Sequence, residues 1–269
     1  MASTTSNTSV TYAESKGRKT LYDTIISVKV GPSAVVFSLR KGILCQHSAL
    51  FHAALSGPFK EATSQTISLP TANVDTFERF QTWVYADQIL QRGETLKDLD
   101  YESIIKLYLL AESTLTPRLQ NAALDTIIDK AALHQTQPSI ACSGLIYENT
   151  KSTSLLRKLF VDMATRSRLR DWESFNAEAS ELYHNAFLVD LALALDEERS
   201  SCGSHGFSKH LSELRCSYHV HAEGEPKCHW GGKTVRFDVG EEKGEGEKAR
   251  GDVFRNRLGN VNVFNEVML

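Results

Sequence analysis

The feature that most constrains this chain is a pair of alternating apolar segments near its beginning, separated by a short turn. Ile26, Val28 and Val30 recur at every second position, which is the period of a strand with one buried face. Residues 31–34 begin with glycine and proline, two residues that favour turns. The same period then returns at Val35, Phe37 and Leu39. Two strands joined by so short a turn predict a β-hairpin.

Helical spacing dominates the chain after the hairpin. The apolar residues of 41–55 predict one helix, which glycine and proline at 57–58 should end. Residues 67–69 predict a short third strand. Three further helices are indicated by apolar stripes at Phe77, Phe80, Trp83 and Val84, at Ile104, Leu107, Tyr108, Leu110 and Ala111, and at Leu119, Ala123, Leu124, Ile127 and Ile128. Asn73 is expected to cap the first of these helices, and Thr116 with Pro117 to begin the last.

The order of these elements predicts an α+β domain with a small sheet and a mostly helical body. After about residue 135 the apolar stripes are weaker, and two more helices are expected around 155–163 and 187–195. The ends are polar, and the glycine- and charge-rich run 240–251 has too little apolar surface to offset its ordering entropy. We therefore divide the chain into a disordered leader (1–19), the α+β domain (20–130), a smaller helical extension (131–200), a Cys/His-containing segment (201–230) and a disordered tail (231–269).

Composition excludes several classes of function. The net charge is −3 and the pI about 6.3, so there is no basic field to hold a nucleic acid. No segment approaches the length of a membrane span, and the polar beginning of the chain does not resemble a secretory signal. The five cysteines are odd in number and scattered, as expected for reduced thiols. We expect an intracellular protein of the cytoplasm or nucleus that contacts neither membranes nor nucleic acids.

Residues 37–51 resemble the signature of BTB/POZ domains, in which a strand leads into a helix carrying Leu44, Ser48 and Phe51 at this spacing. Asp23, before the first strand, is a further similarity. After residue 51 the similarities continue in the family's order, in the segments 57–61 and 67–70, in Phe77 to Tyr85, and in the pair 107–112 and 119–123. The resemblance covers about 110 residues. With the helices that follow, the chain is most similar to the BTB proteins common in filamentous fungi. The chain departs from the family at Arg40, where histidine is frequent, and in a longer loop at 91–100.

The resemblance implies a BTB/POZ fold, in which a small sheet is flanked by a helical bundle. It also implies a protein-interaction module that forms a homodimer through its first helix and N-terminal segment. In BTB adaptors, an apolar residue and an acidic residue at the positions of Phe59 and Glu61 contact a cullin scaffold of ubiquitin ligases. An apolar anchor beside an orienting charge is typical of an interface hot spot. The alternative is that Phe59 packs into its own domain and Glu61 is a solvated charge.

A second candidate site lies in the Cys/His-containing segment. Cys216, His219, His221 and Cys228 supply two thiolates and two imidazoles, the ligand set that tetrahedral zinc prefers. Four protein ligands would leave no open position, so such a zinc ion would be structural. The spacing is not that of a known zinc finger, and a His-rich linker without metal is the alternative. Beyond this zinc ion, we expect no cofactor.

No catalytic constellation is evident, so we predict that the chain is not an enzyme. Cys45 and His47 lie within the apolar pattern of 41–55, which indicates a packed thiol rather than a nucleophile. No nucleophile elbow, zinc-protease histidine pair, phosphate-binding loop or dinucleotide fingerprint is present. The leading hypothesis is an adaptor that acts as a substrate receptor of a cullin-type ubiquitin ligase. The alternatives are a homo-oligomerising scaffold and a subunit of a transcription regulator, neither with a role in ubiquitination.

Overall fold

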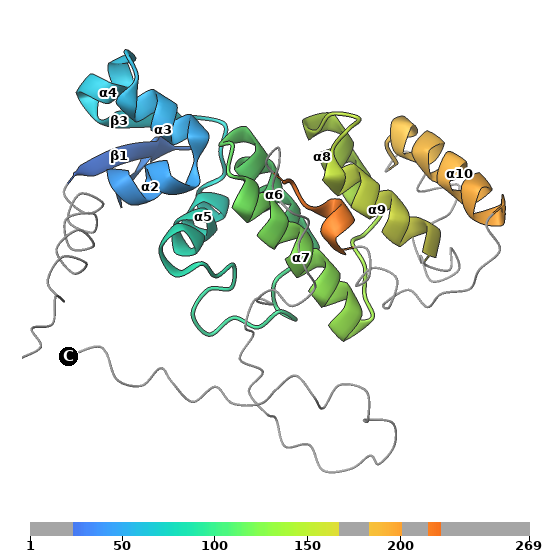
Figure 1. Ribbon diagram of the computed structural model, residues 1–269. Helices are drawn as coiled ribbons and strands as arrows, with labels where there is room; N and C mark the ends of the chain where they lie inside the picture. The colour runs from blue at the N-terminus through green and yellow to red at the C-terminus, as the bar shows by residue number, and fades with distance from the viewer. Residues whose placement is uncertain (1–23, 167–182, 201–214, 222–269) are drawn as a thin grey trace, which may run out of the picture. The chain divides into compact units, whose positions relative to one another are not determined.

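The computed structural model describes residues 24–166, 183–200 and 215–221, and within them the sheet has three strands in the order β2-β1-β3. The central strand β1 (Ile25–Val30) pairs antiparallel with β2 (Val35–Arg40), which confirms the predicted hairpin. The third strand, β3 (Thr66–Leu69), pairs with β1 in parallel, so the chain between β2 and β3 crosses over through helices. Figure 1 shows these helices beside the sheet.

One face of the sheet is buried and the other is exposed. Ile26, Val28 and Val30 are almost fully buried, and Ile26 lies opposite the buried Leu39. Ile25 and Val36 belong to the opposite face, where both are more than half exposed. The alternation seen in the sequence therefore identified the core face of β1 correctly.

The helix predicted over 41–55 is wrong in one respect, because the structure divides it into two. Helix α2 (Lys41–His47) and helix α3 (Ala49–Ser56) meet at Ser48, which has an extended backbone. The Ser48 hydroxyl accepts a hydrogen bond from the Phe51 N–H and donates one to the Thr114 carbonyl, so it caps α3 and ties it to a distant loop. A serine that bonds to the backbone competes with helix continuation, and this explains the break.

The short helix α4 (Lys60–Ser64), which precedes β3, was not predicted, whereas α5 (Val74–Ala86) follows Asn73 as expected. The Asn73 side chain accepts a hydrogen bond from the Thr76 N–H, as expected for a cap. Phe77, Phe80, Trp83 and Val84 form the buried stripe of α5.

Helices α6 (Tyr101–Ser113) and α7 (Pro117–His134) pack against each other as a pair. Pro117 occupies the beginning of α7, as predicted, but the Thr116 side chain does not cap the helix. Its hydroxyl instead lies 3.0 Å from that of Thr114, inside the turn between the two helices. Most of the apolar residues predicted for these helices are fully buried.

The rest of the described chain is helical. Helix α8 (Cys142–Asn149) was not predicted, whereas α9 (Leu155–Arg166) and α10 (Asn185–Ser200) fall where helices were expected. A 3-10 turn, η3 (Arg215–Tyr218), follows. One continuous buried cluster runs from β1 to Leu191 of α10 and Tyr218 of η3. The leader at 1–19, the tail at 231–269 and most of the segment 201–230 lie outside the described residues.

None of the helices in the described ranges combines the length and the apolar character needed to cross a membrane.

Candidate interaction surfaces

Phe59 lies at the corner between α3 and α4 and is 54% exposed. It occupies the position just before α4, where its carbonyl accepts a hydrogen bond from the Ala62 N–H at 3.1 Å. The ring lies against Gly57. A Cβ atom at Gly57 would be 3.0 Å from Phe59 Cδ2 and 2.6 Å from the Ala53 carbonyl oxygen. The absence of a side chain at Gly57 therefore allows the ring to take this position and leaves about half of it facing outward.

Glu61 lies in the first turn of α4, with its side chain 27% exposed. Lys60 Nζ lies 4.0 Å from Glu61 Oε1, and the lysine side chain is 91% exposed. An ion pair with one solvated partner at that separation contributes little, so the carboxylate can exchange this contact for another. No residue of α4 is buried, and the structure thus presents Phe59 and Glu61 together on a surface corner.

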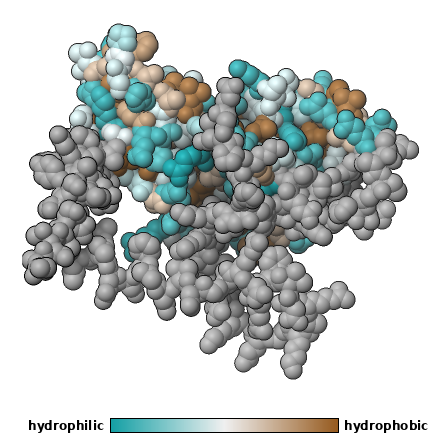
Figure 2. Space-filling model, viewed as in Figure 1, coloured by the Kyte–Doolittle hydropathy of each residue, from teal (hydrophilic) through white to brown (hydrophobic). Residues whose placement is uncertain are grey.

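The outer face of the hairpin is a second exposed region. Ile25 is 55% exposed and Val36 is 57% exposed, with Ser27 and Ser38 paired between them. Figure 2 shows the same mixture of apolar and polar residues over the visible part of the surface. At the far side of β2, the Tyr85 hydroxyl accepts a hydrogen bond from the Arg40 N–H at 2.8 Å. The α5 side chain thus satisfies one backbone donor of the edge strand.

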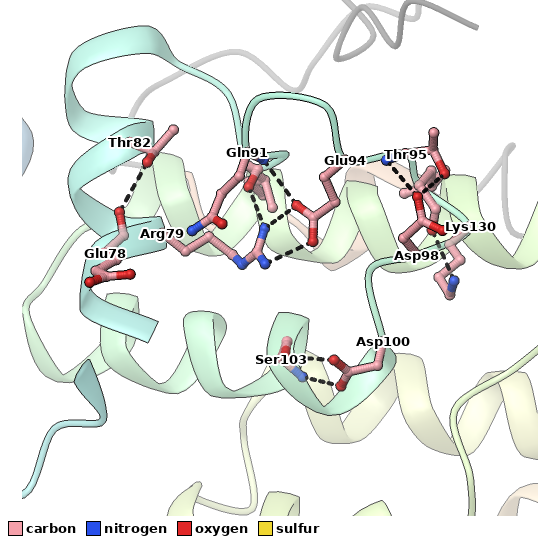
Figure 3. A network of polar contacts seen from close by, with 12 residues as sticks. Glu78, Arg79, Thr82, Gln91, Glu94, Thr95, Asp98, Asp100, Ser103 and Lys130 are labelled. Atoms are coloured by element: carbon pink, nitrogen blue, oxygen red, sulfur yellow. Dashed lines mark hydrogen bonds and ion pairs between the residues drawn. The ribbon is translucent and has the colours of Figure 1, made fainter. Parts of the chain in front are cut away.

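The loop between α5 and α6 is held by a network of polar contacts. Both terminal nitrogens of Arg79 donate to Glu94, at 2.6 and 2.9 Å, and Glu94 also accepts from the Gln91 N–H (Figure 3). Further along the loop, Asp98 accepts from Thr95. Lys130 of α7 is buried and donates to the carbonyls of residues 96 and 97. The loop is therefore a fixed part of the domain surface.

Comparison with protein families matches residues 12–127 to the BTB/POZ domain. The chain carries a BTB/POZ domain. A BTB/POZ domain is a protein-interaction module, and the matched range includes both Phe59 and Glu61. A search of curated proteins found no significant match.

The BTB/POZ match ends in the middle of α7, but the buried cluster continues beyond it. Helix α7 continues seven residues past the match, to His134. The apolar side chains of α8 and α9 belong to the same buried cluster as those of α6 and α7. The chain after the BTB/POZ match is therefore packed onto the domain at least as far as α9.

Cys45 sits in the BTB/POZ part of the chain as a packed thiol. Burial raises its pKa, although Lys41 nearby opposes this effect. The sulfur lies 3.7 Å from the Phe51 carbonyl oxygen. His47 packs its ring edge-on against Trp83, and burial lowers its pKa. Because its pKa is raised, the Cys45 thiol has less thiolate character than a reactive cysteine.

The predicted zinc ligands are only partly brought together. Cys216 Sγ lies 3.4 Å from His221 Nε2, whereas His219 Nε2 lies 2.9 Å from Asp125 Oδ1 of α7. Cys228 lies outside the described residues. Within the ranges that the structure describes, no group of three or more His, Cys, Asp or Glu side chains is arranged to hold a metal.

The sequence did not point to the polar row on α7 that meets these residues. Asn121, Asp125 and Asp129 succeed one another at one-turn spacing on this helix. Asp125 and Asp129 both contact Arg215, and Asn121 contacts Val220. The spacing of the three residues is visible in the sequence, but the segment that they hold lies about 90 residues away along the chain.

Proposed function

We propose that this protein is an adaptor whose BTB/POZ domain binds a cullin-type scaffold through the corner formed by Phe59 and Glu61. The rest of the chain would bind a client, so the protein acts as a substrate receptor and catalysis belongs to its partners. The observation that carries this proposal is the half-exposed Phe59 ring beside a carboxylate, inside the range that matches the BTB/POZ family. Such an adaptor would work within the cell, in the cytoplasm or nucleus.

The affinity for a partner would come from the free energy gained when the exposed Phe59 ring is removed from water. Covering the exposed half of Phe59 in a partner's groove would contribute roughly 1–2 kcal/mol. One side of the ring packs beside Gly57, and the other side is open to a partner. Glu61 stands two residues away, and among the described residues its ion pair is the weak one with Lys60. An anchor and an orienting charge at this separation fit the pattern of an interface hot spot.

The test is a direct binding measurement with the purified full chain and a panel of cullin N-terminal fragments from the source organism. We expect micromolar or tighter binding to at least one cullin and a loss of at least thirtyfold in the double variant Phe59→Ala/Glu61→Ala. Leu133→Ala, which removes another exposed apolar side chain, should change the affinity less than twofold. Undiminished binding by the double variant, or no binding by the wild type, would contradict the proposal.

A homo-oligomerising scaffold with no role in ubiquitination is the second candidate, and a transcription-regulator subunit is a variant of it. The exposed Ile25 and Val36 on the outer face of the hairpin favour self-association, because burying them between two copies would remove apolar surface from water. Light scattering on a sizing column tests this candidate. A homodimer at micromolar concentration supports it, and a strict monomer contradicts it.

A structural zinc site remains a proposal for Cys216, His219, His221 and Cys228. A sulfur and a nitrogen bound to one tetrahedral zinc lie about 3.5 Å apart, close to the 3.4 Å between Cys216 Sγ and His221 Nε2. With His219 Nε2 beside Asp125, a metal would bind this ring at Nδ1, with the carboxylate as its outer partner. Metal analysis of the purified chain should give about one zinc per molecule, lost in Cys216→Ser. A wild-type protein without zinc would remove the proposal.

A further inference from the structure

Residues 215–221 lie against α7 and α9, held by several polar contacts and by the buried ring of Tyr218. Figure 1 shows η3 beside these two helices, in agreement with the contacts between them. In the sequence, residues 201–214 separate this segment from the end of α10. A short peptide thus occupies a surface built by elements that lie 50 to 90 residues earlier.

Arg215 makes the first anchor. Its Nη1 donates to Asp125 Oδ1 at 2.9 Å and its Nη2 donates to Asp129 Oδ1, with only 15% of the arginine side chain exposed. Burial lowers the pKa of Arg215, but the two carboxylates outweigh this effect and raise it. Burial also raises the pKa of the Asp129 carboxyl, even beside the guanidinium. The guanidinium of Arg215 thus balances two carboxylates on this surface.

Tyr218 makes the second anchor, from the opposite side. The side chain is fully buried, and its hydroxyl donates to Asp162 Oδ2 of α9 at 2.7 Å. The Nζ atom of Lys158 lies 5.3 Å from the ring centroid, within range of a cation–π contact. The surface thus takes an aromatic residue with a donor at its tip, three positions after the arginine.

Asn121 makes the third anchor, to the peptide backbone. Its side-chain nitrogen donates to the Val220 carbonyl at 2.9 Å, and its oxygen accepts from the Val220 N–H at 2.7 Å. A side-chain amide that satisfies both groups of one residue fixes an extended peptide whatever side chain it carries, because both bonds go to backbone atoms. The Val220 side chain itself is partly exposed.

We propose that the α7–α9 surface is a peptide-recognition site for segments with the pattern Arg-x-x-Tyr followed by an extended residue, and that residues 215–221 occupy it as an intramolecular ligand. The site is formed by Asn121, Asp125 and Asp129 on α7 and Asp162 on α9. Because this segment belongs to the same chain as the site, its effective concentration there can be on the order of millimolar, and the contact then forms even when the free peptide binds only at about 100 µM. A partner segment of the same chemistry would bind by displacing it.

The first experiment measures whether the segment binds as a separate molecule. A fluorescein-labelled peptide spanning residues 213–222 is titrated with the full chain, in the presence of a metal chelator. The variant Arg215→Ala/Tyr218→Phe, which weakens the internal ligand, should bind the peptide at least tenfold more tightly than the wild type. Adding Asp125→Asn/Asp129→Asn to that variant should abolish binding.

Two variants of the labelled peptide serve as controls. An Arg215→Ala peptide should lose at least tenfold in affinity, whereas a Val220→Ala peptide, which keeps both backbone contacts, should stay within threefold. Equal binding to the wild type and the opened variant would overturn the proposal. So would an opened variant that keeps its circular dichroism and melting behaviour but binds no peptide.

Hydrogen exchange separates a displaceable ligand from an integral part of the core. In Asn121→Ala, the amides of residues 215–221 should exchange at least tenfold faster while those of α6 stay unchanged. Faster exchange throughout α6 and α9 would show that the segment is inseparable from the core, and would overturn the proposal. Glu102→Gln, on the exposed face of α6, is the matched control and should leave both regions unchanged. None of these readouts depends on cullin binding, so this proposal and the proposed function can fail independently.

Discussion

Glu94 ties the loop between α5 and α6 to Arg79 of α5 (Figure 3). Burial alone would raise its pKa, but the hydrogen bonds from Arg79 and the Gln91 N–H outweigh this and hold the pKa below its ordinary value. A carboxyl group whose pKa is lower in the folded state stabilises the fold above its unfolded pKa. That contribution is lost as the pH falls through the folded pKa.

The Glu94→Gln variant should therefore be less stable than the wild type at pH 7, by about 1–3 kcal/mol, because Arg79 loses its charged partner. The difference should shrink as the pH falls through the lowered pKa of Glu94, because the carboxylate of the wild type then becomes protonated. Chemical denaturation at several pH values measures both effects. The control Glu102→Gln disrupts an exposed ion pair with Lys106 and should cost less than about 0.5 kcal/mol. A difference that stays constant from pH 7 to pH 3 would contradict this account.

At the scale of elements, the corner between α3 and α4 depends on Gly57. Replacing it with alanine would place a Cβ atom 2.6 Å from the Ala53 carbonyl oxygen and 3.0 Å from the Phe59 ring. We expect Gly57→Ala to destabilise the fold by about 1–3 kcal/mol, as overpacking does, and to displace Phe59. Gly144 in α8 is the matched control, since a Cβ atom there meets nothing within 4 Å. Gly144→Ala should be neutral or stabilising by up to about 1 kcal/mol. Thermal melting compares the two, and equal effects would refute the role given to Gly57.

Some helices and strands were predictable from the sequence, and others were not. The alternation in β1 and the cap at Asn73 were predictable because each is set by residues close together in the chain. The break at Ser48 was missed because it depends on the Thr114 carbonyl, which is 66 residues away. Helix α8 was missed because it has only 8 residues and one of its three buried residues is the polar Ser143, so its apolar stripe is short.

The residues of the candidate sites were likewise predictable only where the signal lies in a short stretch of sequence. Phe59 and Glu61 were identified from a short local pattern, and the structure places both on the surface. The contact of Arg215 with Asp125 and Asp129 could not be anticipated, because no local signal joins two segments so far apart. His219 belongs to the same surface: its Nε2 lies 2.9 Å from Asp125 Oδ1, and its ring centroid lies 6.1 Å from that of His221.

At the scale of the whole molecule, the buried cluster extends past the BTB/POZ match. Leu156, Leu159 and Phe160 of α9 are almost fully buried in the same cluster as Ile127 and Ile128 of α7. A chain shortened to end at residue 134 would expose these α7 side chains to water. We expect it to melt at a lower temperature than the full chain, or to aggregate. An unchanged, reversible melting transition would show that the later helices add nothing to the BTB/POZ core.

The central claim is that the molecule acts by binding proteins through its BTB/POZ domain, with Phe59 and Glu61 contacting a cullin scaffold. Quantitative affinity purification from cells, comparing the wild type with Phe59→Ala/Glu61→Ala at equal expression, tests it most directly. The account predicts that the wild type recovers a cullin and other proteins of the ubiquitin system, and that the double variant loses them at least tenfold while its remaining partners are unchanged. Recovery of the cullin in equal amounts by both proteins, or its absence from the wild-type sample, would contradict the claim.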